Sequence, residues 1–170
     1  MGLIAGIDVG TTSAAVVIDE DTLEVVAALS VTYARDGQMW HNHDVTMDLA
    51  RFIRDAGRAT GAEVIAVMVE QAFMGRGVAA GMSVQRKQGW LELAAIRCLG
   101  PVLADARTAV QLRRQVGLPN RKAEAHAALL ARYPDAEPLD EHQRDAFVAA
   151  LAMADLIERE PVEIGAPERP

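Results

Sequence analysis

Four side chains that could act together in catalysis lie at or near the ends of apolar segments of this sequence. Asp8 closes an apolar run that starts at Leu3, and Glu70 closes the run "VIAVMV". His142 and Asp145 lie three positions apart in "HQRDAFVAALAMAD", a spacing that places two side chains on one face of a helix. Taken singly, Asp8 also fits a turn-initiating residue, and Glu70 fits a surface charge at a strand end. Their occurrence together, in this order, is what indicates a site.

The chemistry of this set favours a hard divalent cation. Carboxylates that converge in an apolar interior repel one another, and their burial is costly unless a cation joins them. Carboxylate oxygens with one imidazole suit Mg²⁺ or Mn²⁺, and a zinc cluster of cysteines is excluded because Cys98 is the only cysteine. Two such ions about 3.5–4 Å apart can activate a water and stabilise the leaving oxygen in phosphodiester hydrolysis.

The segment around Asp8 has a second interpretation. "GIDVGTTS", residues 6–13, resembles the first phosphate loop of sugar kinases and actin-like ATPases as closely as it resembles the first strand of an RNase H-like nuclease. An actin-like fold needs two lobes and more than twice this length, and the sequence has no second glycine-rich phosphate loop. We therefore favour the nuclease and keep an actin-fold kinase or ATPase fragment as an alternative.

Charge is unevenly distributed along the chain. The 170 residues carry a formal net charge of −7, whereas residues 76–122 contain nine basic and two acidic residues, a balance of +7. Such a basic segment can place a positive face on a phosphate backbone. Phe73, just before it in a segment with three glycines, is suited to stacking on bases. We expect the DNA-binding residues to be Phe73, Arg76, Arg86, Lys87, Arg113, Arg114, Arg121 and Lys122.

Hydrophobic periodicity predicts the elements that position these residues. Apolar runs over 3–9, 14–18 and 23–31, joined by tight turns, predict three antiparallel strands. Helical spacing over 44–60 leads to a strand over 63–69, which must lie parallel to the first strand because a crossover helix joins the two. The remaining pattern predicts a helix over 83–99, a strand over 102–106, and helices over 108–116, 121–133 and 141–158.

The expected architecture is α/β: an RNase H-like mixed five-stranded sheet, with three antiparallel strands followed by parallel strands, flanked by helices. We expect a single domain over residues 1–158 and a disordered tail over 159–170, because the tail is rich in proline. No secretory signal pattern or spanning apolar run is present, and we expect a cytoplasmic protein with no membrane association.

The last predicted helix is built to approach the sheet. Asp140 is a candidate N-cap, and Gln143, three positions on, is its capping-box partner. The face that carries His142 and Asp145 continues with small alanines, which allow close packing. We therefore expect this helix to bring an imidazole and a carboxylate toward the two carboxylates of the first and fourth strands.

Four motifs together resemble RuvC-type Holliday junction resolvases, endonucleases of the RNase H-like superfamily. They are "GIDVGTTS", "VEQAFMGRG", a basic "RK" before a helix, and "HQRDAFVAALAMAD", in the order found in that family over about residues 2–155. The resemblance implies a homodimer that resolves four-way DNA junctions in recombination and repair. It implies two Mg²⁺ ions per active site, with Mn²⁺ possible, a 5′-phosphate at the cut, and a bacterial or phage origin.

The resemblance also implies roles for individual residues. The residues that match the family's metal-binding quartet are Asp8, Glu70, His142 and Asp145. His142 stands where some relatives have a third Asp, so both a ligand role and a base role stay open. Lys122 matches a lysine that contacts the scissile phosphate, and Phe73 matches an aromatic residue that stacks on bases at the crossover.

Two positions depart from the family pattern or lie outside it. A second family lysine has no counterpart, and Arg113 or Arg114 is the nearest substitute. His126, in "RKAEAHAALL", is interpreted as a surface-helix or partner-contact residue without a catalytic role. A further alternative to the resolvase is a non-catalytic or differently specific nucleic-acid-binding protein of the same fold.

Overall fold

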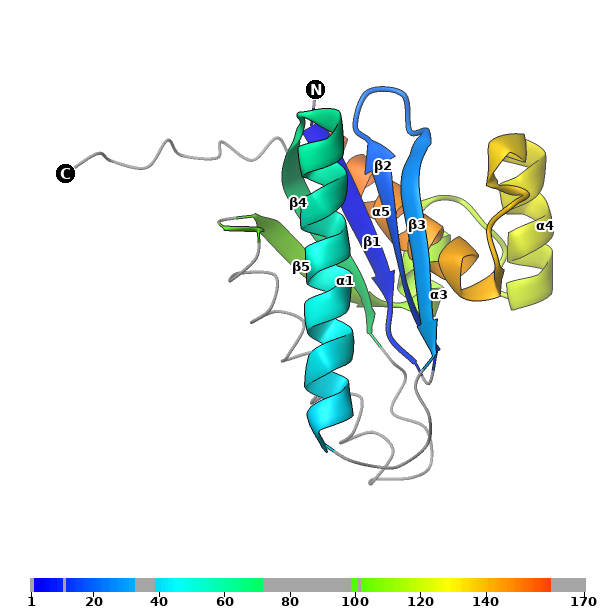
Figure 1. The fold of residues 1–170 in the computed structure, drawn as a ribbon. Helices are drawn as coiled ribbons and strands as arrows, with labels where there is room; N and C mark the ends of the chain where they lie inside the picture. The colour runs from blue at the N-terminus through cyan, green and yellow to red at the C-terminus, as the bar shows by residue number, and fades with distance from the viewer. Residues whose placement is uncertain (1, 11, 33–38, 72–98, 101, 160–170) are drawn as a thin grey trace.

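The computed structural model describes residues 2–10, 12–32, 39–71, 99–100 and 102–159, with side chains from Asp44 onward in the third range. Within this part of the chain, a five-stranded sheet has the order β3-β2-β1-β4-β5 (Figure 1). The first three strands form an antiparallel meander: β1 (Gly2–Asp8), β2 (Thr12–Asp19) and β3 (Val25–Thr32). The predicted mixed sheet is confirmed.

The parallel half of the sheet consists of β1 and two later strands, β4 (Glu63–Gln71) and β5 (Leu103–Thr108). β4 pairs with β1 in parallel, as the crossover through a helix requires, and β5 pairs with β4 in parallel. β4 runs to Gln71, beyond its predicted end, because its ladder with β5 continues to that residue. Glu70 therefore lies inside the strand and not just after it.

The helices follow the predicted order with shifted ends. The first begins at Met39, five residues before its predicted start. The expected helix over 83–99 falls almost wholly outside the described residues. The described helices are α1 (Met39–Thr60), α3 (Ala109–Gln115), α4 (Lys122–Arg132), the 3₁₀ turn η1 (Pro134–Ala136) and α5 (Glu141–Arg159).

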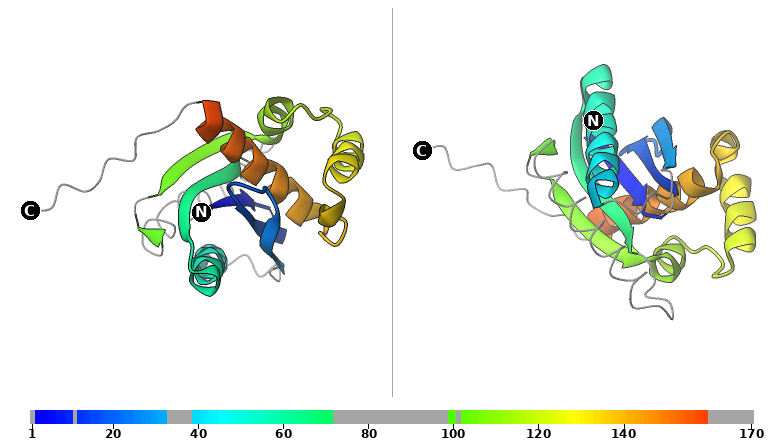
Figure 2. Two further views of the ribbon diagram at one scale, coloured as in Figure 1. Left: turned by 90° about the horizontal axis from the view of Figure 1, so that it is seen from above. Right: turned by 60° about the horizontal axis from the view of Figure 1, so that its bottom comes forward.

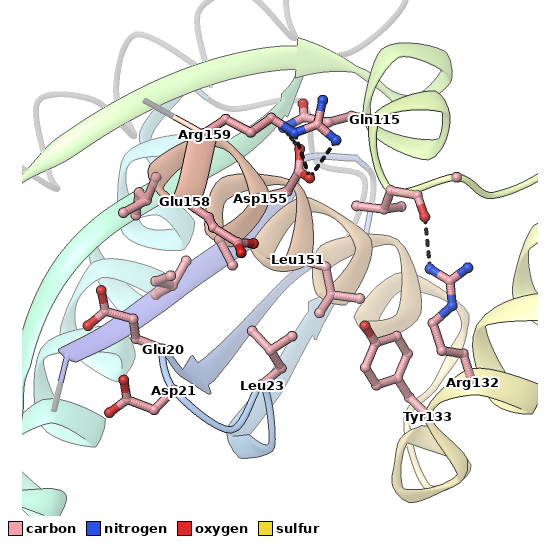
Figure 3. A pocket seen from close by; sticks show the side chains of 15 residues that line it. Glu20, Asp21, Leu23, Gln115, Arg132, Tyr133, Leu151, Asp155, Glu158 and Arg159 are labelled. Carbon is pink, nitrogen blue, oxygen red and sulfur yellow. Dashed lines mark hydrogen bonds and ion pairs between the residues drawn. The ribbon is translucent and has the colours of Figure 1, made fainter. Parts of the chain in front are cut away.

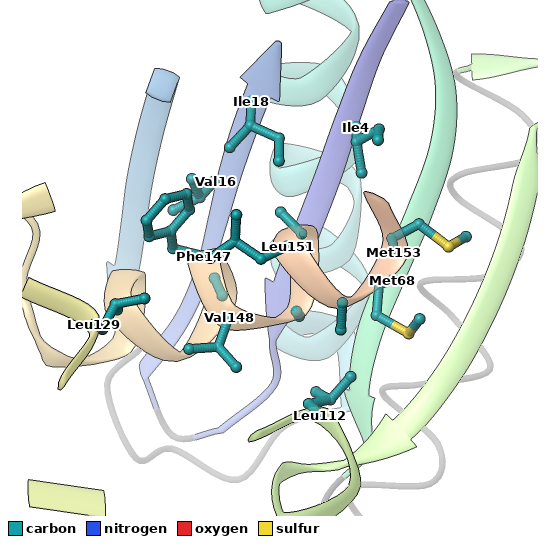
Figure 4. Packing of buried hydrophobic residues seen from close by; sticks show 14 of the residues in the cluster. Ile4, Val16, Ile18, Met68, Leu112, Leu129, Phe147, Val148, Leu151 and Met153 are labelled. Carbon is teal, nitrogen blue, oxygen red and sulfur yellow. The ribbon is translucent and has the colours of Figure 1, made fainter. Parts of the chain in front are cut away.

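α1 and α5 cover opposite faces of the sheet (Figure 2). Alternate residues of each strand face opposite sides, so Ile4 and Met68 pack with α5, and Leu3 and Val67 pack with α1. On the α5 side, Phe147 is buried among these aliphatic side chains (Figure 4) and meets Tyr133 edge-on, with ring centroids 5.3 Å apart. The sheet is thus buried on both faces around β1 and β4.

α5 crosses β1 at very short range. A Cβ atom at Gly6 would clash with the carbonyl oxygen of Ala146 and the backbone nitrogen of Ala150. Only glycine on the strand and small residues on the helix permit this approach, which confirms the role predicted for the alanines. The close crossing fixes the first turns of α5 over the carboxyl ends of β1 and β4.

None of the helices described here has both the length and the apolar character needed to cross a lipid bilayer.

Candidate active site

Asp8 and Glu70 lie side by side at the carboxyl ends of two parallel strands. They are direct partners in the β1–β4 register. Strand alternation points both side chains to the face covered by α5, because Ile4 and Met68 lie at matching positions on that face. Asp8 is buried, and Glu70 is half-buried, with no hydrogen bond or ion pair from its side chain to another described residue. Two carboxylates therefore meet at one protected point.

The first turn of α5 is anchored before it reaches this point. Asp140 accepts a hydrogen bond from the backbone of Gln143 (2.9 Å), and the Gln143 side chain accepts one from the backbone of Asp140 (3.0 Å), which confirms the predicted capping box. Ser30 of β3 donates to the other oxygen of Asp140 (2.6 Å). This cap holds His142 so that its Nδ1 lies 2.9 Å from Oδ2 of Asp8.

Asp145, one turn further on, contacts basic side chains through both of its oxygens. Lys122 Nζ lies 2.6 Å from Oδ2 and also 2.6 Å from an oxygen of Glu141. His126 Nε2 lies 2.9 Å from Oδ1, and a guanidinium nitrogen of Arg113 lies 3.5 Å from the same oxygen. These partners come from α3 and α4, so Asp145 joins both helices to the site.

The carboxylates differ sharply in their electrostatics. Burial raises the pKa of Asp8, and the negative charge of Asp145 adds to this, against the hydrogen bond to His142. Burial first, and then the charges of Asp8 and Asp145, raise the pKa of Glu70 to about 7. Burial also acts to raise the pKa of Asp145, but hydrogen bonds to Lys122 and His126 outweigh it and lower that pKa. Mutual repulsion is thus concentrated on the strand carboxylates.

Comparison with known proteins shows which solved structures share the fold of this chain. No family model matches the chain, and no curated protein matches its sequence. Among solved structures, Thermus thermophilus RuvC in complex with a Holliday junction substrate superposes with a TM-score of 0.72 at 20% identity, covering 94% of this chain and 97% of that one. A second Thermus thermophilus RuvC structure gives 0.69 at 20% identity, covering 92% and 96%.

The chain has the RuvC fold. A more distant match, the yeast mitochondrial Holliday junction resolvase Ydc2, gives a TM-score of 0.50 at 11% identity, covering 89% of this chain and 76% of that one. The RNase H-like architecture predicted from the motifs is therefore confirmed, and the superposition on RuvC spans nearly the whole chain.

The carboxylates of Asp8, Glu70 and Asp145 are chemically suited to bind a hard cation such as Mg²⁺. Among the described residues, no three His, Cys, Asp or Glu side chains are arranged to hold a metal ion. Three of the four candidate ligands are instead paired: Asp8 with His142, and Asp145 with Lys122. Carboxylate oxygens are nevertheless the ligands that Mg²⁺ and Mn²⁺ prefer. A cation would also offset the two causes that raise the pKa values of Asp8 and Glu70, which are burial first and the charges of neighbouring carboxylates second.

Several predicted DNA-binding residues lie outside the described residues: Phe73, Arg76, Arg86 and Lys87. Arg114 and Arg121 are exposed, at α3 and at the start of α4, and stay predictions. Arg113 does not fit an exposed DNA contact, because it is 8% exposed and donates to the carbonyl of Asn120 (3.0 Å) as well as approaching Asp145. Its place is inside the site, where it ties the α3–α4 loop to α5.

His126 is the site residue that the sequence analysis missed. Its interpretation as a surface or partner-contact residue was wrong, because its side chain is 12% exposed and bonded to Asp145. A signal was present: Lys122 and His126 are four positions apart on α4 and so share one face. Once Lys122 is placed at the site, His126 must lie near it.

Proposed function

We propose that this protein is a metal-dependent endonuclease that cuts four-way DNA junctions. The observation that carries the proposal is the register pairing of Asp8 with Glu70 under His142 and Asp145 of α5, on a RuvC fold. One RuvC of this fold has been solved in complex with a Holliday junction substrate. The shared fold and the local carboxylate cluster together support the same substrate class here.

The residues that would hold the metal are Asp8, Glu70 and Asp145. Divalent ions held there would polarise the scissile phosphodiester and make water a nucleophile at neutral pH. Asp145 can take part only if its Oδ2 parts from Lys122, while Oδ1 stays fixed by His126. Glu70, which has no partner among the described residues, needs no such exchange.

His142 is placed to act as a base in this arrangement. Its Nδ1 is engaged by Asp8, so Nε2 is the nitrogen left to accept a proton. The side chain is 39% exposed, which gives a substrate or a water access to it. A ligand role through Nδ1 would require the bond to Asp8 to break, so the geometry supports the base over the ligand.

Lys122 is placed to meet the phosphate that is cut. Its ammonium group bridges Asp145 and the exposed Glu141 and is itself 38% exposed. A phosphate oxygen can replace Glu141 as its partner, and it can also take the place of Asp145 Oδ2 when that oxygen turns to a metal ion. Lys122 would then stabilise the negative charge that grows on the phosphorus oxygens during cutting.

The proposal includes a homodimer. A four-way junction has a two-fold axis, and a C2 dimer presents two equivalent sites to two equivalent strands. Basic residues such as Arg114 and Arg121 would contact the phosphate backbone, so binding should weaken steeply with salt.

One observation favours a second candidate, a junction-binding protein that does not cut. Both oxygens of Asp145 already contact basic side chains, and no three-ligand group is arranged among the described residues. Such a protein would bind a four-way junction equally well with and without Mg²⁺ and would leave it intact.

The experiment is cleavage of an end-labelled mobile four-way junction, with product ends mapped, in Mg²⁺ and in EDTA. We expect paired nicks with 5′-phosphate ends in Mg²⁺ only. Asp8→Asn should abolish cutting and keep junction binding, because it removes one charge and no packing. The matched control is Asp55→Asn, an exposed residue of α1 that pairs only with arginines of its own helix among the described residues. Cutting by Asp8→Asn at the wild-type rate would refute the proposed site.

A further inference from the structure

A groove lies at the end of the sheet opposite Asp8 and Glu70. It has a volume of about 770 Å³ and is lined by the start of β1, the β2–β3 turn, the ends of α3 and α4, and the last turns of α5 (Figure 3). The Glu20 backbone bonds to Gly2, at the opposite end of β1 from Asp8. The groove is therefore separate from the candidate active site.

The groove contains a group of apolar side chains. Ile4 and Leu151 are buried, and Leu23, Tyr133 and Ile157 are partly buried against the same core. Leu23 has a φ of 59°, in the left-handed region that is unfavourable for a leucine because of its Cβ atom. Asp19 holds this turn by accepting hydrogen bonds from the backbones of the next residues (2.9 and 3.0 Å). The fold thus maintains a strained turn whose leucine lines the groove (Figure 3).

Around these apolar residues the carboxylates are only partly neutralised. Asp155 is paired with Arg159 (2.8 Å) and accepts from Gln115 (3.0 Å), and Arg132 donates to a backbone carbonyl. The lining carboxylates with no side-chain partner among the described residues are Glu20, Asp21 and Glu158. The groove therefore presents an apolar surface with an excess of negative charge.

We propose that this groove binds a basic amphipathic segment of a partner protein, with leucine-like side chains on one face and lysine or arginine beside them. Charge selects this occupant, because unpaired carboxylates repel the phosphates of a nucleic acid and attract cations. The apolar residues require side chains of matching character, which a simple cation lacks. The groove lies away from the candidate active site, so partner and DNA can bind together. The inference does not depend on nuclease activity.

The test uses a labelled helical peptide with leucines on one face and lysines on the other. Binding to the full chain is followed by fluorescence anisotropy, and the site is located by amide chemical shifts in NMR. We expect shifts at Leu23, Gly117 and Glu158, and binding that weakens as salt rises. The triple variant Glu20→Gln, Asp21→Asn, Glu158→Gln should weaken binding at least ten-fold, whereas the control Asp55→Asn should not change it.

Three outcomes would overturn the proposal. One is equal binding by the wild type and the triple variant. Another is equal binding of a peptide with the same composition but scrambled order, because this would show attraction by charge alone. The third is a fall in the sedimenting mass of the triple variant, which would show that the groove holds a second copy of this chain. An unchanged circular dichroism spectrum would confirm that the variant is folded.

Discussion

Glu70 on β4 and Asp145 on α5, the strand end and the helix end of the candidate site, differ in their cationic contacts and in the direction of their pKa shifts. On β4, Glu70 has no cationic contact among the described residues, and its pKa is raised to about 7. On α5, Asp145 contacts Lys122, His126 and Arg113, and its pKa is lowered. One half of the site therefore holds a carboxylate that is destabilised by burial and by neighbouring negative charges, and a divalent cation can relieve both. The other half is already balanced, and it fixes the basic residues that would meet the substrate.

The largest expected effect on stability comes from removing the balanced carboxylate. Asp145→Asn leaves Lys122, His126 and Arg113 close together without their shared anion. Losing one partner of a buried ion pair costs about 3–5 kcal/mol. We expect about 2–4 kcal/mol here, because Lys122 is partly exposed. Urea unfolding measures this loss.

The control for that measurement is Asp155→Asn, on the same helix, whose partners are Arg159 and Gln115. It should cost about 1 kcal/mol, since the ion pair is more exposed. Equal losses of unfolding free energy in the two variants would show that Asp145 contributes no more to stability than the less buried carboxylate of Asp155.

Glu70→Gln should change the free energy of unfolding in the opposite direction and stabilise the protein. Because the folded-state pKa of Glu70 lies above its usual value of 4.5, ionisation destabilises the fold. Its contribution to stability is complete below pH 4.5 and is lost as pH rises through about 7. Glu70→Gln should therefore unfold with a higher free energy than the wild type at pH 8 in EDTA, by up to about 3 kcal/mol, because each unit of pKa shift corresponds to about 1.4 kcal/mol.

Thermal melts at pH 5 and pH 8 separate this effect from a general benefit of glutamine. The gain should be present at pH 8 and nearly absent at pH 5, where the wild-type Glu70 is protonated. If Glu70→Gln were less stable than the wild type at pH 8, the inference that ionised Glu70 destabilises the fold while Asp145 stabilises it would be wrong.

The smallest expected effect concerns His126, which acts through Asp145. His126→Ala should leave Asp145 Oδ1 free to turn and raise the Mg²⁺ concentration needed for half-maximal cutting about ten-fold. This is the lower end of the 10–100-fold loss of metal affinity that is typical when an outer-shell partner is removed. His126→Gln, whose amide can donate the same bond, should recover most of it. Mn²⁺ titration by calorimetry gives a readout independent of cutting. A lower rate with unchanged metal dependence in His126→Ala would count against a positioning role.

The sequence predicted the part of the site that depends on local patterns and topology. Asp8 and Glu70 could be placed together because a crossover forces β1 and β4 to be parallel neighbours. The spacing of His142 and Asp145, with the cap at Asp140, placed the other pair on one helix face. These inferences need only periodicity and handedness, and the structure agrees with them.

The contact of Arg113 with Asp145 could not be predicted, because it joins α3 to α5 across 32 positions and no local pattern states how these helices pack. His126 meets Asp145 across 19 positions, and only its shared helix face with Lys122 pointed to the site. The end of β4 was also missed, because its extension to Gln71 depends on pairing with β5. Tertiary contacts determine which side chains meet and where a strand ends, whereas the local sequence pattern determines which helices and strands form.

Single-turnover cleavage of a four-way junction by the wild type and by Glu70→Gln, in Mg²⁺ at pH 8, shows whether the carboxylate of Glu70 is needed for metal-dependent cutting. Glu70→Gln should be at least as stable as the wild type, so a loss of cutting would not reflect unfolding. We expect paired nicks in opposing strands by the wild type and none by Glu70→Gln, with junction binding kept. Cutting by Glu70→Gln at the wild-type rate would contradict this requirement for the Glu70 carboxylate.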